Sequence, residues 1–249
     1  MNDIKAIGFD LFNTLIIVEP DTLIHAMKRM IKSLRGSGFV FEESSYIRDY
    51  RNAASAYVAE ARKSGMETHN SIWVSHVLNS YGVDILPDDK RIGEAVDKYF
   101  TAFYDRVNLI PDTLETLTML KNRYPLGLLS NFTHAPAARE ILIRTGLASC
   151  FETVLISGEL GYRKPHSYAF EELAKGLGVK KEEIVFTGDD PEPDIHGASI
   201  AGLRPVWFTY IIDRDVPVIR GTIQSEITTP DIDVPRASSW KEFLAILDA

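Results

Sequence analysis

The sequence predicts an α/β fold, an open parallel sheet flanked by helices with a helical domain inserted near the N-terminus. In the second half of the chain, short apolar runs typical of buried strands alternate with stretches of helical periodicity. About a hundred residues without a convincing strand separate the first such run from the others. This stretch is too long for a loop and indicates an insert with structure of its own.

Five apolar runs are predicted to be strands, because each is short, bounded by polar or glycine-containing turns and apolar on both faces. They are Ala6–Phe9, Leu126–Leu129, Val154–Ile156, Ile184–Phe186 and Pro205–Phe208. Helical periodicity follows the second, third and fourth runs, at Ala135–Arg144, Ser167–Leu177 and Ile195–Ala201. This alternation of strands and helices predicts that the sheet is parallel.

The insert is predicted to be a helical cap that covers the sheet. Amphipathic spacing indicates helices at Asp21–Leu34, Glu43–Ser64, Ser71–Tyr81 and Ile92–Phe103. We expect hinges near Ile17–Pro20 and Asn108–Pro111. The chain then divides into a core of residues 1–17 and 109–249 and a cap of residues 18–108. After Thr209, a loop containing proline and threonine precedes a closing helix at Trp240–Leu247.

The composition is that of a globular protein, with 249 residues, 45% of them hydrophobic and 25% charged. No apolar run approaches the ~18 residues of a membrane-spanning helix, and the N-terminus lacks a targeting pattern, so we expect a cytoplasmic protein that does not bind membranes. A net charge of −8 argues against nucleic acid as a partner, but leaves a small anionic substrate open. The single cysteine, Cys150, is expected to be structural. Nothing in the sequence indicates an oligomeric state.

Polar and charged side chains follow the predicted strands at their carboxyl ends. Asp10 and Asn13–Thr14 follow the first strand, Ser130–Asn131 the second and Asp189–Asp190 the fourth. Ligands bind at this edge of open parallel sheets, so we expect the side chains to share one site. A glycine-containing loop after the third strand could bring Lys164 to the same edge.

Four segments together resemble the ordered motifs of the haloacid-dehalogenase-like superfamily, whose core is a Rossmann-like sheet. They are DLFNT at Asp10–Thr14, Ser130 in LLSN, Lys164 in YRKP, and GDDPEPD at Gly188–Asp194. Each motif alone is a weak signal, whereas four in the correct order on the correct elements are specific. The resemblance covers residues 5–17 and 110–208, and the insert lies where the superfamily carries its C1-type cap.

The resemblance implies a catalytic role for five residues. Asp10 would be a nucleophile that is transiently esterified by the substrate, with Thr14 positioning its loop. Ser130 and the backbone N–H of Asn131 would donate hydrogen bonds to a transferring phosphoryl group, and Lys164 would neutralise its charge. The alternatives are ordinary ones: Asp10 capping a turn, Ser130 capping a helix, and Lys164 solvated on the surface.

The resemblance also implies a magnesium site. Asp10, Asp189 and Asp194 would surround Mg²⁺, and by family analogy the main-chain carbonyl of Phe12 would be a further ligand. Charge balance favours a cation, because three carboxylates face a single lysine. The alternative is an acidic turn in which Asp194 caps the helix predicted to begin at Ile195.

Phe12 departs from the superfamily's pattern, because most of its phosphatases have a second aspartate at this position. That aspartate protonates the leaving oxygen, and such catalysis is worth about 10²–10⁴ in rate. His134, Glu159 or Asp190 could replace it. The prediction is a magnesium-dependent phosphohydrolase acting on a small phosphorylated metabolite with a good leaving group.

Two alternatives remain open at this stage. Phe12 favours a 2-haloacid dehalogenase, since that group carries an aromatic residue at this position, whereas the intact acidic set favours magnesium. The second alternative is a catalytically weak binding or regulatory protein that keeps the fold. Substrate identity is expected to lie in the cap, where Tyr57, Trp73 and Tyr99 are candidate pocket residues, although their helical spacing is also typical of core.

Overall fold

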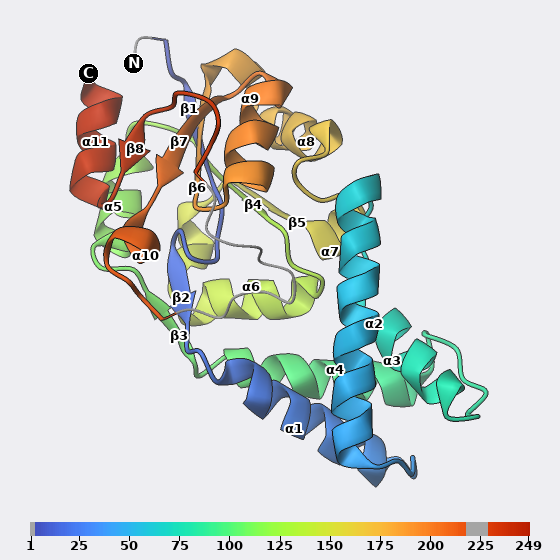
Figure 1. The fold of residues 1–249 in the computed structure, drawn as a ribbon. Coiled ribbons are helices and arrows are strands. Elements are labelled where there is room, and N and C mark those ends of the chain that lie inside the picture. The colour runs from blue at the N-terminus through green and yellow to red at the C-terminus, as the bar shows by residue number, and fades with distance from the viewer. Residues whose placement is uncertain (1–2, 218–228) are drawn as a thin grey trace.

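The chain forms a six-stranded parallel sheet flanked by helices, which confirms the predicted fold class (Figure 1). The computed structural model describes residues 3–217 and 229–249, so part of the loop predicted after Thr209 lies outside the described residues. The strand order is β5-β4-β1-β6-β7-β8, with β1 in the interior of the sheet. The strands are β1 Ala6–Phe9, β4 Leu126–Ser130, β5 Thr153–Ile156, β6 Ile184–Gly188, β7 Arg204–Phe208 and β8 Arg236–Ala237.

Helices cover the sheet on both faces. Ala6, Leu129 and Phe186 pack against α8 (Ser167–Leu177) and α9 (Gly197–Ala201), whereas alternate strand residues form the larger core on the other face. The helices that contribute to this second face are α5 Thr113–Leu120, α6 Ala135–Arg144 and α11 Trp240–Asp248. Helix α8 lies so close to the sheet that a Cβ atom at Gly127 would come within 2.6 Å of the Leu173 side chain. A larger residue at position 127 would therefore force the Leu173 side chain to shift.

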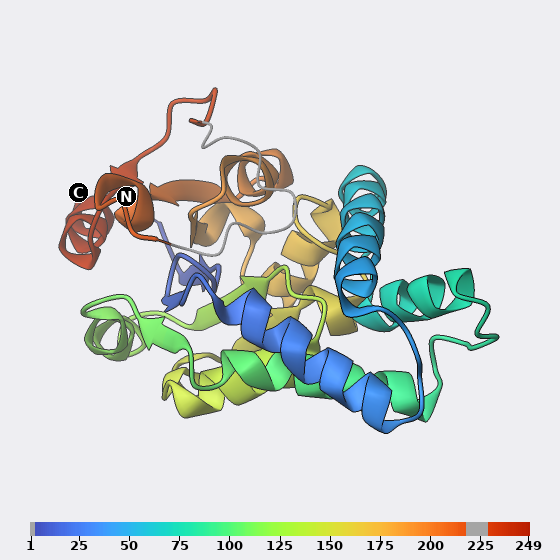
Figure 2. The same cartoon turned by 60° about the horizontal axis from the view of Figure 1, so that its bottom comes forward.

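Four helices form the insert, and they lie beside the sheet in both views (Figures 1 and 2). They are α1 Thr22–Gly36, α2 Glu43–Ser64, α3 Asn70–Ser80 and α4 Lys90–Phe100, and the turn Thr101–Phe103 continues α4 as a 3₁₀ helix. Helices α1 and α4 pack closely against each other. Each has an apolar face of buried residues spaced one helical turn apart, such as Met30 and Leu34 in α1 and Ile92 and Val96 in α4. Glu42 caps the N-terminus of α2, and its carboxylate accepts hydrogen bonds from the N–H groups of Ser44 and Ser45.

Two short antiparallel strands connect the insert to the core. They are β2 (Ile16–Val18) and β3 (Val107–Leu109), and they occupy the segments where the sequence predicts hinges and no strand. At three residues each, they are too short for alternation to identify them. The division of the chain into a core and a cap at residues 17 and 109 stays a prediction.

The other differences from the predicted elements are local. Short helices α7 (Ser157–Leu160) and α10 (Tyr210–Asp213) were not predicted, nor were α5 and β8. The helix predicted at Ile195–Ala201 instead begins as a π-helical segment, Pro191–His196, which leads into α9. Its prolines, Pro191 and Pro193, lie in the first turn, where backbone N–H groups have no partner within the helix, so both are tolerated there.

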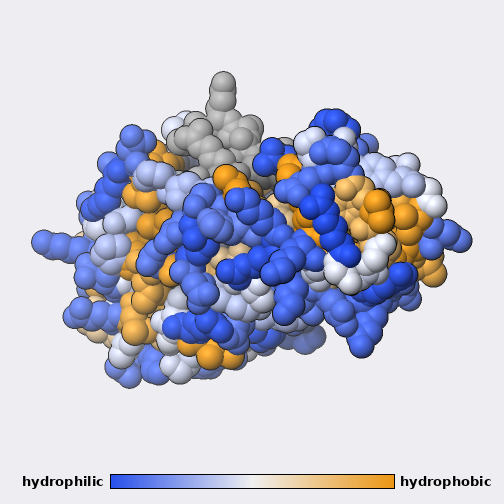
Figure 3. Space-filling model, turned by 90° about the horizontal axis from the view of Figure 1, so that it is seen from below, coloured by the Kyte–Doolittle hydropathy of each residue, from blue (hydrophilic) through white to orange (hydrophobic). Residues whose placement is uncertain are grey.

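The outer surface is largely hydrophilic on the face seen from below, where hydrophobic residues form separate patches (Figure 3). Within residues 3–217 and 229–249, no helix combines the length and the apolar character needed to cross a bilayer. Cys150 is buried, as expected for a packing residue.

Candidate active site

Asp10 and Lys164 form a buried ion pair at the carboxyl edge of the sheet. Asp10 follows β1 directly, and its Oδ1 lies 2.6 Å from Nζ of Lys164. The same Nζ lies 2.7 Å from Oδ1 of Asp194, and Thr14 Oγ1 donates to Asp10 Oδ2 at 3.5 Å. Lys164 is only 2% exposed, so it is not a solvated surface lysine. The structure therefore brings together four of the residues singled out in the sequence.

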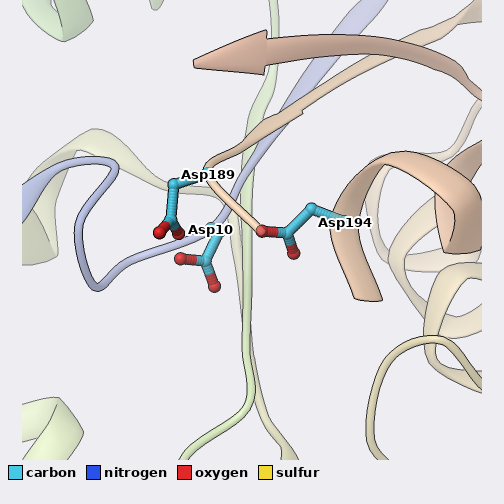
Figure 4. A group of neighbouring side chains, drawn as sticks. All are labelled: Asp10, Asp189 and Asp194. Carbon is cyan, nitrogen blue, oxygen red and sulfur yellow. The ribbon is translucent and has the colours of Figure 1, made fainter. Parts of the chain in front are cut away.

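Three carboxylates converge on this ion pair. One oxygen from each of Asp10, Asp189 and Asp194 lies within 4.8 Å of the others, and Figure 4 shows the carboxyl groups turned toward a common space. Asp189 follows β6, where its carbonyl accepts a hydrogen bond from the indole of Trp207 at 3.0 Å. A Cβ atom on Gly188 would lie 2.3 Å from the Asp194 carboxyl, so only glycine lets this carboxyl group approach the end of β6.

The capping alternative for Asp194 is wrong in this structure. The residue that caps the π-helical segment is Asp190, whose carboxylate accepts from the N–H of Glu192 at 3.3 Å. Asp194 lies within the segment, and its Oδ2 accepts from the backbone N–H of Asp190 at 3.0 Å. This bond orients the Asp194 carboxyl toward the ends of the strands.

The carboxylates destabilise one another's charged forms. Burial, opposed by Lys164 and assisted by the charge of Asp194, raises the pKa of Asp10 to about 7. Burial and the charges of Asp10 and Asp194 raise the pKa of Asp189 well above its ordinary value. Burial alone would lower the pKa of Lys164, but Asp10 and Asp194 outweigh it and raise that pKa. One ammonium group is thus too little positive charge for three carboxylates.

Ser130 and Asn131 follow β4 and lie at the same edge. The Ser130 hydroxyl is buried without a hydrogen-bond partner among the described residues, although it lines the cavity described below. A capping serine would have such a partner, so this orphaned donor points to a ligand. The Asn131 side chain donates to the carbonyl of Lys164 at 2.9 Å and accepts from its N–H at 2.8 Å. Asn131 therefore fixes the backbone of the lysine, a role that the sequence did not suggest.

A cavity of about 320 Å³ opens in front of the carboxylates, between the sheet edge and the insert. Its lining includes the predicted residues Asp10, Ser130, Asn131, Lys164, Asp189 and Asp194, and also Phe12. Thr14 is buried beneath this edge and does not line the cavity. Trp73 and Tyr99 line the wall formed by the insert, as considered from the sequence, whereas Tyr57 contacts His76 instead.

Of the three side chains considered as replacements for the missing aspartate, only Asp190 lines the cavity. Burial and the charge of Asp194 raise the pKa of Asp190 to about 6. His134 lies elsewhere, paired with Asp97 at 3.0 Å. Glu159 forms an ion pair with Arg139. Neither residue is placed to act on a ligand bound at Asp10.

The insert is tied to the core by a buried ion pair that the sequence did not reveal. Glu67, between α2 and α3, pairs with Arg163 at 3.1 Å and accepts a hydrogen bond from Ser157. The backbone N–H of Glu67 donates to Gly161, and that of Arg163 donates to Gly65. Both residues of the ion pair line the cavity. Because Glu67 and Arg163 lie far apart in the sequence, no local pattern identifies them as a pair. The sequence places Arg163 directly before the predicted site residue Lys164, and this position is the signal that could have drawn attention to it.

An open parallel sheet with a carboxylate that follows β1, a buried lysine and two further carboxylates after β6 defines a class of α/β hydrolytic sites. The family model of haloacid dehalogenase-like hydrolases matches residues 4–202, and the chain belongs to this family.

Curated relatives include a glyceraldehyde 3-phosphate phosphatase of Methanopyrus kandleri and a ribulose-1,5-bisphosphate 5-phosphatase of Halopiger xanaduensis. The first is 34% identical over 64% of this chain, and the match spans 63% of that relative, less than two thirds of its length. The second is 30% identical over 82% of this chain and 84% of the relative. A solved 2-haloacid dehalogenase from Pseudomonas syringae pv. Tomato DC3000 has a similar fold, with a TM-score of 0.71, 22% identity and 98% coverage of both chains.

Proposed function

We propose that the protein is a magnesium-dependent phosphohydrolase that forms a phosphoryl ester on Asp10. The observation that carries this proposal is the grouping of Asp10 with Lys164 at 2.6 Å and with two more carboxylates within 4.8 Å. The phosphatase names of the two relatives support it. The substrate is proposed to be a small phosphorylated molecule bound in the cavity.

The side chains divide the work of phosphoryl transfer among them. Asp10 attacks phosphorus in line with the leaving oxygen, and the P–O bond to the leaving group breaks as the bond to Asp10 forms. The Ser130 hydroxyl and the backbone N–H of Asn131 donate to the phosphoryl oxygens, where negative charge develops. Lys164 balances the charge of Asp10 and of the phosphoryl group. Water then attacks phosphorus, releases phosphate and restores the Asp10 carboxylate.

The donor set fits a magnesium ion. Mg²⁺ prefers oxygen ligands in octahedral geometry and keeps several waters, so the carboxylates of Asp10, Asp189 and Asp194, with the Phe12 carbonyl by family analogy, are sufficient to hold it. When bound, the ion supplies positive charge that keeps Asp10 ionised and stabilises the transferring phosphoryl group. The excess of buried carboxylates over lysine is the structural reason to expect it.

Phe12 determines which leaving groups are suitable. Its ring lies in the cavity wall, stacked on Phe132 with 4.8 Å between centroids, and it cannot transfer a proton. Leaving groups that depart as stable anions, such as those of acyl and aryl phosphates, need no proton from the enzyme. Asp190 is an acidic side chain that lines the cavity, and its elevated pKa favours its protonated form at mildly acidic pH.

A 2-haloacid dehalogenase is the second candidate, because halide also departs without a proton and Phe12 is aromatic as in that group. The retained set of three clustered carboxylates favours phosphoryl transfer, since carbon–halogen displacement has little use for a cation site. The third candidate, a weak binding or regulatory protein, keeps the same fold but not the activity.

One set of assays separates the three candidates. The purified protein is incubated with 4-nitrophenyl phosphate and acetyl phosphate, each with magnesium or with EDTA, and with 2-chloropropionate to detect released chloride. We expect phosphate release that requires magnesium and no chloride release. Chloride release that persists in EDTA would establish the dehalogenase. Silence in every assay would support the third candidate and contradict the proposal.

A further inference from the structure

The wall of the cavity that faces the carboxylates is mainly apolar. The insert contributes Leu23 from α1, Tyr50 and Val58 from α2, Trp73 from α3 and Tyr99 from α4. These are aliphatic and aromatic side chains from four different helices. A leaving group that extends from the phosphorus toward the insert therefore meets hydrocarbon.

An aromatic cluster continues this apolar wall onto the core. Phe12 stacks on Phe132 with 4.8 Å between ring centroids, and Phe132 makes T-shaped contacts with Phe100 and Phe103, with centroids 5.2 Å and 5.9 Å apart. All four rings line the cavity. Phe12 thus has two consequences: the site lacks the usual aspartate at position 12, and the cavity gains an aromatic surface on which a ring can pack.

Polar groups of Tyr50, Asn70 and Trp73 on the insert side already have protein partners. Asn70 donates to the Tyr50 hydroxyl at 2.8 Å and accepts from Thr133 at 2.6 Å. The Trp73 indole donates to Thr68 at 2.9 Å. A sugar or polyol leaving group would have to compete with these bonds, because its own hydroxyls need partners once they are buried.

The charge of the lining disfavours a second anionic group. Six carboxylates line the cavity, namely Asp10, Glu67, Asp189, Asp190, Glu192 and Asp194. Three cations line it, namely Arg62, Arg163 and Lys164, of which Lys164 is held by Asp10 and Asp194 and Arg163 by Glu67. A magnesium ion with one phosphoryl group leaves this region negative, so a carboxylate or second phosphate on the leaving group would be repelled.

We propose that the substrate's leaving group is an acyl or aryl unit whose body is an aromatic ring or a branched hydrocarbon, with no charged group besides the oxygen that leaves phosphorus. This inference rests on the proposed phosphohydrolase function and names its substrate class. It separates this chain from the two relatives described above, which are named for substrates that carry hydroxyls or a second phosphate. A cavity of about 320 Å³ is within the range of small-molecule sites and has room for one ring beside a phosphoryl group.

Four acyl phosphates test the inference, because their leaving carboxylates are similar in acidity and differ in apolar surface and charge. The kcat/KM values for acetyl, butyryl, benzoyl and succinyl phosphate are measured with magnesium and corrected for spontaneous hydrolysis. We expect benzoyl phosphate to exceed acetyl phosphate about 10- to 100-fold, the usual value of added apolar groups in a pocket. Succinyl phosphate matches butyryl phosphate in length but is charged, and should be at least about tenfold poorer.

A pair of neighbouring variants locates the effect in the cavity wall. Leu23 is half-buried and lines the cavity, whereas Ile24 is 51% exposed on the same helix and does not. Leu23→Asn should reduce the benzoyl-to-acetyl preference several-fold, and Ile24→Asn should leave it unchanged. Thermal melting of both variants establishes that they are folded.

The outcomes distinguish the two proposals. Hydrolysis of all four acyl phosphates with equal efficiency, or a preference for succinyl over butyryl phosphate, overturns the inference and leaves the phosphohydrolase function standing. Equal effects of the two variants on the benzoyl-to-acetyl ratio also overturn it. Hydrolysis of none of the four acyl phosphates overturns the inference, and if 4-nitrophenyl phosphate is not hydrolysed either, the proposed function is refuted as well.

Discussion

Phe12→Asp restores the acid that the superfamily's phosphatases place at this position, and its effects can be worked out from the structure. The ring is half-buried and stacked on Phe132. Losing the stack costs about 0.5–1.5 kcal/mol, and losing partial burial costs about 1 kcal/mol more. The total is small beside the ~5–15 kcal/mol that holds a typical domain together, so the variant should fold.

The new carboxyl group would join a site that already holds Asp10, Asp189 and Asp194. Neighbouring negative charge and burial raise the pKa of such a group, which suits a general acid. We expect turnover of 2-phenylethyl phosphate, an apolar substrate with a poor leaving group, to rise about 100-fold, the lower limit for general acid–base catalysis. Turnover of 4-nitrophenyl phosphate, whose leaving group needs no proton, should change by less than about threefold.

Phe12→Asn is the matched control, because asparagine has nearly the same shape as aspartate but cannot donate a carboxyl proton. Steady-state assays of the parent and both variants on the two substrates, with magnesium, provide the comparison. Equal gains on both substrates, or the same gain from Phe12→Asn, would refute the reasoning that position 12 lacks a proton donor.

Three further changes test other parts of the site. Asp189→Asn removes one of the clustered carboxylates, so the magnesium concentration for half-maximal activity should rise about tenfold or more as turnover falls; an unaltered magnesium response would exclude Asp189 from the metal site. Glu67→Gln leaves Arg163 buried without its carboxylate and should lower the free energy of unfolding by about 3 kcal/mol in urea titrations. The control for Glu67→Gln is Glu43→Gln, which breaks an exposed ion pair with Arg35 and should change the free energy of unfolding by less than about 0.5 kcal/mol. Similar losses in the two variants would contradict the idea that burial makes the Glu67–Arg163 pair important. Asn131→Ala removes both hydrogen bonds to the Lys164 backbone and should lower kcat about tenfold. It should also lower the free energy of unfolding by about 1–3 kcal/mol. An unchanged kcat would show that Lys164 keeps its position without Asn131.

The sequence predicts the core of the fold because its signals are local. Buried strands such as Ala6–Phe9 are continuous apolar runs, and the helices α2, α6 and α8 have the predicted bounds because their periodicity extends over at least ten residues. Strands β2 and β3 were missed because three residues are too few to show alternation. The turn of π-helix after Asp190 was missed because two prolines and four acidic residues allow several local structures.

The site residues that follow strands could be predicted from the sequence, whereas those brought together from distant segments of the chain could not. Asp10, Ser130 and Asp189 each come directly at or after the end of a strand, so their meeting at one edge follows from a parallel sheet. The Glu67–Arg163 pair joins residues 96 positions apart, and no local pattern specifies it. Tyr50, Trp73 and Tyr99 have the spacing of core residues, and only the packing of the helices shows that they face a cavity.

The central claim is that Asp10 carries the phosphoryl group during turnover. It is tested most directly by acid quenching of the protein during hydrolysis of an acyl or aryl phosphate, followed by mass mapping of its peptides. We predict a phosphoryl group on the peptide that contains Asp10 in the parent protein, and none in Asp10→Asn. A phosphoryl group on another residue, or an unmodified protein that turns over substrate rapidly, would contradict the account.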